Sequence, residues 1–321
     1  MTSTSEAMGE APSMATASLA TGVRPFFWSV RRELWEHRSI YIVPAAVSAV
    51  VIAGVLLAAL RGSQMGWGTP LFTRTGPGAG EYLLAQAVVS GTLFPLLNGT
   101  AAITFGGLLT GFFYCLGALN GERRDRSILF WKSLPVSNAT TVASKVFVAM
   151  AILPVCVFAA IVVTHLAVLA ILAAPLVAHG QSLDLLTDLP LLRGWLLLAW
   201  AAFASSLWWA PIYGWALLVS AWAKRLTLLW AVLPPIGLAV FERLAFGAQH
   251  VERIISHRLS GGLELSFEFP VRVHPPTVGH VYLPDVDPAG FLTGSGLWLG
   301  LAFAALCFAG AIWLRRRAEP V

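Results

Sequence analysis

The chain has 321 residues, of which 57% are hydrophobic and 12% are charged, and its mean hydropathy is +0.74. Soluble domains carry about one quarter of charged residues, so this composition excludes an ordinary soluble protein and predicts an integral membrane protein. The net charge of +5 is divided into short clusters between apolar runs, which argues against a nucleic-acid-binding face.

The N-terminal residues 1–23 are rich in serine, threonine and alanine and lack the basic start and apolar core of a signal peptide, so we predict a disordered cytoplasmic tail. The next stretch, RPFFWSVRRELWEHR (24–38), places Phe27, Val30 and Leu34 at helical spacing. We predict an amphipathic helix that lies flat at the cytoplasmic interface. The alternative is a solvated helix that simply leads into the first span.

Six apolar runs are long enough to cross a hydrocarbon core about 30 Å thick. The fold class that follows is an all-α membrane protein, with residues 24–321 as a single six-span domain. The predicted spans are Ile40–Leu60, Leu93–Leu119, Ala143–Leu172, Gly194–Trp222, Leu226–Phe246 and Leu292–Leu314.

Most of the 21 lysines and arginines cluster on one side of these spans, and basic residues near span ends are retained in the cytoplasm. Both termini are therefore predicted to be cytoplasmic. The basic residues on this side are Arg24, Arg31, Arg32, Arg38, Arg123, Arg124, Arg126, Lys132, Lys145, Lys224, Arg225, Arg315, Arg316 and Arg317.

The loop at about 247–291, between the fifth and sixth spans, is the largest predicted extracytoplasmic element. Its segment LELSFEFPVRVH (263–274) alternates apolar and polar residues, which predicts a strand in a small cap, with Pro270 at an edge. Four histidines in this loop match no zinc spacing, and the three cysteines lie in apolar runs, so no metal site is predicted. The histidines are His250, His257, His274 and His280.

The connection ERRDRSILFWKSLPVS (122–137), between the second and third spans, concentrates charges and aromatic residues on the cytoplasmic side. A short helix would end before Pro135, and Ser137 or Asn138 would cap the third span. So short a helix is unstable alone, so its apolar side chains need a covering surface. One interpretation is an interfacial turn in the lipid headgroups, and the other is a docking element for a cytoplasmic partner.

This connection, together with the topology and the helix before the first span, resembles the permease subunits of type-2 ABC exporters. The resemblance is specific in ERRDRSILFWKSLPVSNATTVASK (122–145) and implies a coupling helix that inserts into a cleft of an ATPase subunit. The implied ATPase-coupling residues are Glu122, Arg123, Arg124, Asp125, Arg126, Ser127, Ile128, Leu129, Phe130, Trp131 and Lys132.

The same resemblance implies the function, which is the permease of an ATP-driven exporter in the bacterial cytoplasmic (inner) membrane. Its substrate class would be an amphipathic or hydrophobic molecule such as a peptide, an antibiotic or a lipid-linked compound. The chain contains no G-x-x-x-x-G-K-[ST] motif, so we predict no catalytic or cofactor-binding residue here, and ATP and Mg²⁺ would bind a separate ATPase subunit. A second permease copy or a paralogue would complete the dimer.

Small and weakly polar residues share one face of the second span and predict either helix packing or a dimer seam and substrate path. They are Thr100, Thr104, Gly107 and Gly111. His165, inside the third span, is expected to be a neutral residue bonded to a neighbouring helix. Two other functions remain open: a membrane enzyme that acts on lipid near His165 or the outer loop, and a non-transporting anchor or sensor that recruits a cytoplasmic partner.

Overall fold

Long apolar helices form most of the structure. The computed structural model describes residues 14–61, 94–124, 136–178, 186, 189–260, 267–268 and 285–317. Within these residues, six helical segments are long and apolar enough to cross a membrane, so the protein is an all-α, multi-pass membrane protein. They are α2 (Ser39–Arg61), α4 (Phe94–Ala118), α7 (Asn138–Phe147) continued by α8 (Leu153–Ala178), α10 (Leu191–Trp222), α11 (Thr227–Phe246) and α14 (Ser295–Arg317).

The third span begins earlier and ends later than the sequence predicted. Its first helix starts at Asn138, because the Ser137 hydroxyl caps the helix by accepting a hydrogen bond of 3.0 Å from the Thr140 N–H. Capping by Ser137 was one of the two predicted alternatives. The added turns make this span long enough to extend beyond a bilayer or to tilt within it.

A π-helical turn, η3 (Val148–Ile152), separates α7 from α8 within this span. The Leu153 N–H bonds to the Val148 carbonyl, one residue further back than in an α-helix. Pro154 follows, and in a regular helix its ring would clash with the carbonyl four residues earlier. The wider turn relieves this clash and lets the span continue through the proline.

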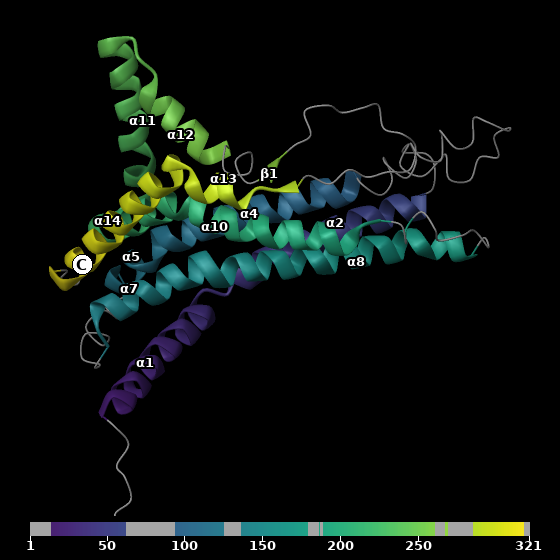
Figure 1. Cartoon of the computed structure of the whole chain (residues 1–321), viewed down its shortest axis with the longest axis horizontal. Helices are drawn as coiled ribbons and strands as arrows, with labels where there is room; N and C mark the ends of the chain where they lie inside the picture. Colours follow the sequence, from purple (N-terminus) through teal and green to yellow (C-terminus); the bar gives the residue numbers. More distant parts are fainter. Residues whose placement is uncertain are drawn as a thin grey trace, which may run out of the picture.

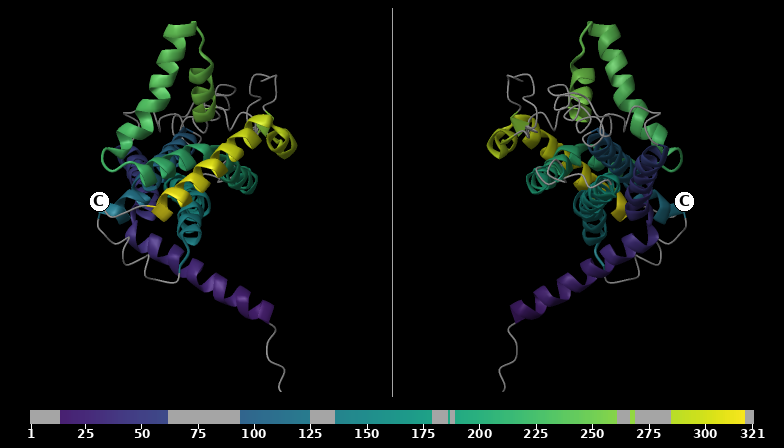
Figure 2. Two further views of the ribbon diagram at one scale, coloured as in Figure 1. Left: turned by 90° about the vertical axis from the view of Figure 1, so that its left-hand side faces the viewer. Right: turned by 90° about the vertical axis from the view of Figure 1, so that its right-hand side faces the viewer.

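The spans α2, α4, α8 and α10 run side by side along the long axis of the molecule (Figure 1), and α14 packs chiefly on α10. Gly214 permits this close packing, since a side chain there would meet the Ala304 backbone at 3.2 Å. By contrast, α11 rises away from the bundle (Figures 1 and 2), and only its Ala231 is buried. The bundle therefore consists of the other five spans, and α11 is attached to it mainly through its first turns.

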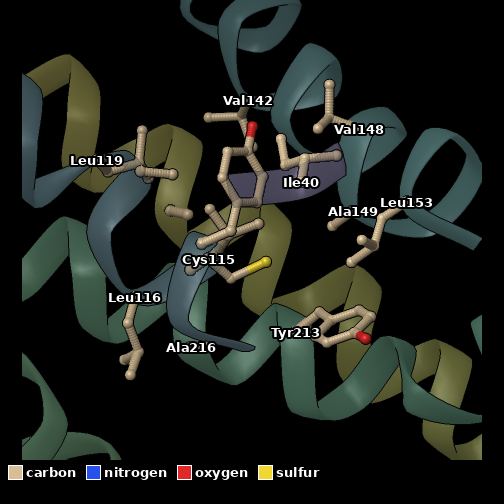
Figure 3. Packing of buried hydrophobic residues seen from close by; sticks show 14 of the residues in the cluster. Ile40, Cys115, Leu116, Leu119, Val142, Val148, Ala149, Leu153, Tyr213 and Ala216 are labelled. Carbon is tan, nitrogen blue, oxygen red and sulfur yellow. The ribbon is translucent and has the colours of Figure 1, made fainter. Parts of the chain in front are cut away.

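The largest apolar core lies between α4, α7, α8 and α10, where buried side chains converge from all four helices (Figure 3). Cys115 lies near its middle, Tyr213 contributes from α10, and Ile40 adds the start of α2. Small residues set the spacing here. At Gly111 an added Cβ atom would lie 2.7 Å from the Tyr213 hydroxyl and 2.9 Å from the Leu153 side chain.

The N-terminal helix α1 (Met14–Glu36) begins within the segment for which the sequence predicted a disordered tail, and not near Arg24. The alanines of this segment, with Met14 and Leu19, are good helix formers, and Pro25 is accommodated inside the helix. A short bend at residues 37–38 turns the chain, so that α1 points away from the bundle while α2 enters it (Figures 1 and 2). Phe27, Trp28 and Trp35 on α1 are exposed, whereas Val30 and Leu34 of the predicted apolar face pack against the core; whether α1 lies at a membrane interface stays a prediction.

The loop between α11 and α14 contains helices that the sequence analysis did not predict, on either side of the segment predicted as a strand. The helices α12 (His250–Ser260) and α13 (Pro288–Thr293) occupy its two ends, and α12 folds back beside α11 (Figure 1). The predicted strand is described only at β1 (Phe267–Glu268), which pairs antiparallel with β2 (Asp285–Val286). Pro270 and the rest of 263–274 lie outside the described residues.

Candidate functional site

A buried group of charged side chains joins four segments at the end of the bundle where α5 (Asn120–Arg124) lies; we call this the α5 end. We call the group the ionic cluster. Its members are Arg32 and Glu33 from α1, Glu122 from α5, Lys145 from α7 and Arg315 from α14. Glu33 and Lys145 are fully inaccessible to solvent, and Glu122 and Arg315 are buried. Charges are rarely buried unless they are paired, so these contacts determine how the four segments meet.

Lys145 lies at the centre of the ionic cluster and bridges the two carboxylates. Its Nζ atom is 2.7 Å from Glu33 Oε1 and 3.1 Å from Glu122 Oε1. Arg32 bridges the same pair, with Nη2 at 2.9 Å from Glu33 Oε1 and 2.7 Å from Glu122 Oε1. Arg315 donates to the second oxygen of Glu122. The two carboxylates thus share their cations, and removal of one partner leaves the others incompletely compensated.

Tyr114 completes the hydrogen bonding of Glu33, because its hydroxyl donates to Glu33 Oε2 at 3.0 Å. His37 packs edge-on against the Tyr114 ring, with centroids 4.9 Å apart. At Arg32, burial alone would lower the pKa, but the carboxylates of Glu33, Glu122 and Glu36 together raise it. The guanidinium therefore stays charged.

Glu33, Glu36 and His37 offer ligand atoms within 4.8 Å of one another, a spacing that a metal ion could bridge. Glu33, however, already accepts hydrogen bonds from Lys145 and Tyr114. A cation bound there would have to compete with these donors for the Glu33 oxygens. The contacts of Glu33 therefore indicate an ion-pair network and not a metal centre.

The α5 helix is also fastened to the end of α10. Arg123 donates to the Ala221 carbonyl at 2.6 Å, and the Asn120 side chain donates to the Ala223 carbonyl at 2.6 Å. The Ser220 hydroxyl accepts hydrogen bonds from the backbone N–H groups of residues 119 and 120. These bonds satisfy carbonyls that the end of a helix leaves free, and they hold the start of the 125–135 connection in place.

Three of the eleven predicted coupling residues are described. Glu122 and Arg123 are buried within the chain, where they position the start of the connection, and Arg124 is exposed. The other eight, Asp125 to Lys132, lie outside the described residues. The structure therefore describes both bases of the connection, at α5 and α7, and not the segment for which docking was predicted.

A groove of about 390 Å³ lies between α4, α8 and α10. Three residues of the predicted dimer seam or substrate path, Thr100, Thr104 and Gly107, line it. The fourth, Gly111, lies deeper and packs against Tyr213 and Leu153 of the same chain. The small-residue face of α4 thus has two roles within one chain: close helix packing at one end and a groove wall along the rest.

His165 lies beside this groove in a hydrogen-bonded chain. The Thr100 hydroxyl donates to the Leu96 carbonyl, so it accepts from His165 Nε2 at 2.8 Å. The Trp195 indole N–H donates to His165 Nδ1 at 3.3 Å. These bonds require a neutral ring protonated at Nε2, and they join α4, α8 and α10 as the sequence analysis expected.

Sequence analysis did not identify the ionic cluster as a site, although each of its residues is visible in the sequence. Arg32, Lys145 and Arg315 served only to predict orientation. One signal was available: Glu33 follows buried Val30 by three residues and therefore lies on the apolar stripe of α1. A carboxylate on such a stripe requires a buried cation as a partner.

Comparison with protein-family models, with curated proteins and with solved structures finds no match to this chain.

Proposed function

We propose that this chain is the permease subunit of an ATP-driven ABC exporter that moves an amphipathic or hydrophobic substrate across a bacterial cytoplasmic membrane. A separate cytoplasmic ATPase would bind ATP and Mg²⁺ and would dock on the 125–135 connection. The proposal combines the sequence resemblance of residues 122–145 with the six apolar helices of the structure. The observation that carries it is the ionic cluster at the two bases of this connection.

The ionic cluster supports a mechanism in which force on the connection reaches several spans at once. Glu122 precedes the connection, Lys145 follows it, and the two side chains form an ion pair of 3.1 Å. Glu33 and Arg315 bond to this pair from α1 and α14. Because these contacts are short and directional, a displacement of the connection would move α1, α7 and α14 together.

The third span offers a route from the ionic cluster to the groove. Lys145 lies on α7, one turn before the π-helical turn η3, and Leu153 and Pro154 directly after that turn line the groove. A π-turn is a local irregularity at which a helix can change its path. We infer that movement of α7 alters the groove by bending the span at η3.

The groove has the chemical character expected for an amphipathic substrate. Its walls are mainly apolar, with Phe158, Ile161 and Leu198 among them, and Thr104 and Ser205 add hydroxyl groups. A volume of about 390 Å³ lies within the range of ligand-binding pockets. It is large enough for the apolar part of a substrate, while the hydroxyl groups would bond to its polar part.

Reconstitution with an ATPase whose gene neighbours that of this chain would test the proposal. We expect Ile128→Ala with Trp131→Ala to abolish ATPase association and substrate-stimulated ATP hydrolysis while leaving membrane insertion intact. The matched control is Ile42→Ala with Trp35→Ala, which removes the same side chains at exposed positions elsewhere. Hydrolysis and transport would be followed in liposomes with fluorescent amphipathic peptides and lipid analogues.

Two results would contradict the proposal. Unchanged ATPase association in the Ile128 and Trp131 variant would refute docking through the connection. Association without stimulated hydrolysis or transport, for every probe, would instead favour a membrane anchor or sensor that recruits a partner through the same segment.

A further inference from the structure

A second cavity, of about 640 Å³, opens at the α5 end, away from the groove. Arg124 at the end of α5 lines one side, and Lys224 and Arg225 in the turn between α10 and α11 line another. Leu226 and Leu228 complete an apolar wall. We call this cavity the basic pocket, because three cations from two separate elements face it and no carboxylate of the described chain lines it.

The three cations differ from those of the ionic cluster because they lack counterions among the described residues. Arg124, Lys224 and Arg225 are all exposed and form no ion pair within that part of the chain. Like charges that converge on one cavity repel one another, and an anion in the cavity removes this repulsion. The basic pocket is therefore chemically suited to a negatively charged ligand.

The position of the basic pocket relative to the membrane follows from its two flanking helices. The helices α10 and α11 are both candidate spans, so the short turn at residues 223–226 must lie at a membrane surface. Trp222 and Trp230 pack edge-on there, with ring centroids 4.8 Å apart, and tryptophans are enriched at membrane interfaces. Leu226 and Leu228 are 72% and 47% exposed. Cations therefore lie at headgroup level, next to apolar side chains on the membrane side.

The backbone of the turn is held in a fixed geometry that adds donors to the basic pocket. Leu226 adopts a left-handed conformation (φ 54°), which is unfavourable for leucine, and the helix α11 begins at the next residue. The Asn120 side chain fixes the turn by donating to the Ala223 carbonyl at 2.6 Å. The first N–H groups of α11 and its positive helix end thus lie beside the three cations.

We propose that the basic pocket binds the phosphate-bearing headgroup of an anionic phospholipid, whose acyl chains lie against the exposed apolar surface of α11. Phosphate oxygens would bond to Arg124, Lys224 and Arg225. The adjoining Leu226 and Leu228 favour a lipid over an acidic protein surface, because such a surface would complement the cations but leave the leucines without an apolar partner.

Native mass spectrometry of the full chain in detergent would test this site by titration with phosphatidylglycerol and, separately, phosphatidylcholine. We expect at least about tenfold tighter binding of phosphatidylglycerol, since each basic residue near an anionic headgroup contributes measurably. The triple variant Arg124→Gln, Lys224→Gln, Arg225→Gln should lose this preference. The matched control, Arg38→Gln, Arg316→Gln, Arg317→Gln, removes three exposed cations outside the pocket and should keep it. All six positions are exposed, so both variants should fold, which thermal unfolding would verify.

The possible results separate the alternatives. Loss of the preference in the pocket variant alone supports the proposal. Equal loss in both variants would show diffuse charge attraction and would overturn it, as would an unchanged preference. Displacement of phosphatidylglycerol by millimolar inorganic phosphate alone would assign the pocket to a free phosphate and overturn the lipid source. Unchanged lipid binding with weakened ATPase association would assign it to a protein contact and also overturn the proposal.

Discussion

Replacement of Lys145 by methionine tests the ionic cluster directly. Methionine matches the length of the aliphatic part but removes an ammonium group 2.7 Å from Glu33 and 3.1 Å from Glu122. Removal of one partner from a buried ion pair costs about 3–5 kcal/mol. Both carboxylates keep another cation, Arg32, so we expect the lower end, a loss of about 3 kcal/mol in the free energy of unfolding.

The measurement is equilibrium unfolding of the purified chain in mixed micelles, with Arg316→Met as the control at an exposed cation outside the ionic cluster and the basic pocket. The control should not change stability. Combining Lys145→Met with Glu33→Gln removes the charge from both partners, so the double variant should recover about 1–3 kcal/mol relative to the sum of the single losses. Strictly additive losses, or a loss below about 1 kcal/mol for Lys145→Met, would refute the inference that these side chains form one buried network.

Two further changes test the helix contacts around the site. Gly111→Val should destabilise the chain by about 1–3 kcal/mol through overpacking against Tyr213. Gly117→Val, at a position with no neighbour within 4 Å, should not destabilise it. If the two variants have the same unfolding midpoint, the packing inferred at Gly111 is wrong. Ser220→Ala should cost about 1–3 kcal/mol, because two backbone N–H groups at the end of α4 lose their acceptor, and faster hydrogen exchange at those two amides would verify the cause.

The number and the approximate limits of the spans were predictable from the sequence because the bilayer imposes a minimum length on every apolar run. The predicted start of the third span was less accurate. Its first turns, from Asn138 to Val142, include polar residues that a search for apolar runs passes over. The Ser137 cap was predictable because a serine before a helix satisfies backbone donors locally, without any distant partner.

The helix α12 was not predicted, for a related reason. The helix α12 is polar overall, and its position depends on Arg258, which donates to the Gly296 carbonyl at 2.7 Å and stacks 4.1 Å from the centre of the Trp208 ring. These partners lie on α14 and α10, far away in the sequence. Alternation of apolar residues at 263–274 is instead a local signal, and it predicted a strand, of which Phe267–Glu268 is described.

Partners of the ionic cluster were equally distant: Lys145 and Glu33 are 112 positions apart, and Arg315 and Glu122 are 193 apart. Sequence periodicity indicates which face of a helix is apolar, but it does not indicate which charge on another helix will meet that face. The sequence analysis named Glu122 only as a coupling residue, and periodicity gave no sign of its partners within the chain, Arg32, Lys145 and Arg315.

Stability alone does not account for an ionic cluster in this position. Apolar residues of similar volume are often as stabilising as a buried ion pair, or more so, because they avoid the cost of desolvation. Apolar contacts are not directional, so two apolar helix surfaces can shift relative to each other. A carboxylate held by two cations instead fixes the relative register of the helices that carry these side chains. The ionic cluster imposes this register where α1, α7 and α14 meet both bases of the 125–135 connection. Under the proposed function, the chain would transmit a push from that connection into its spans, and a fixed register at both bases would carry that push.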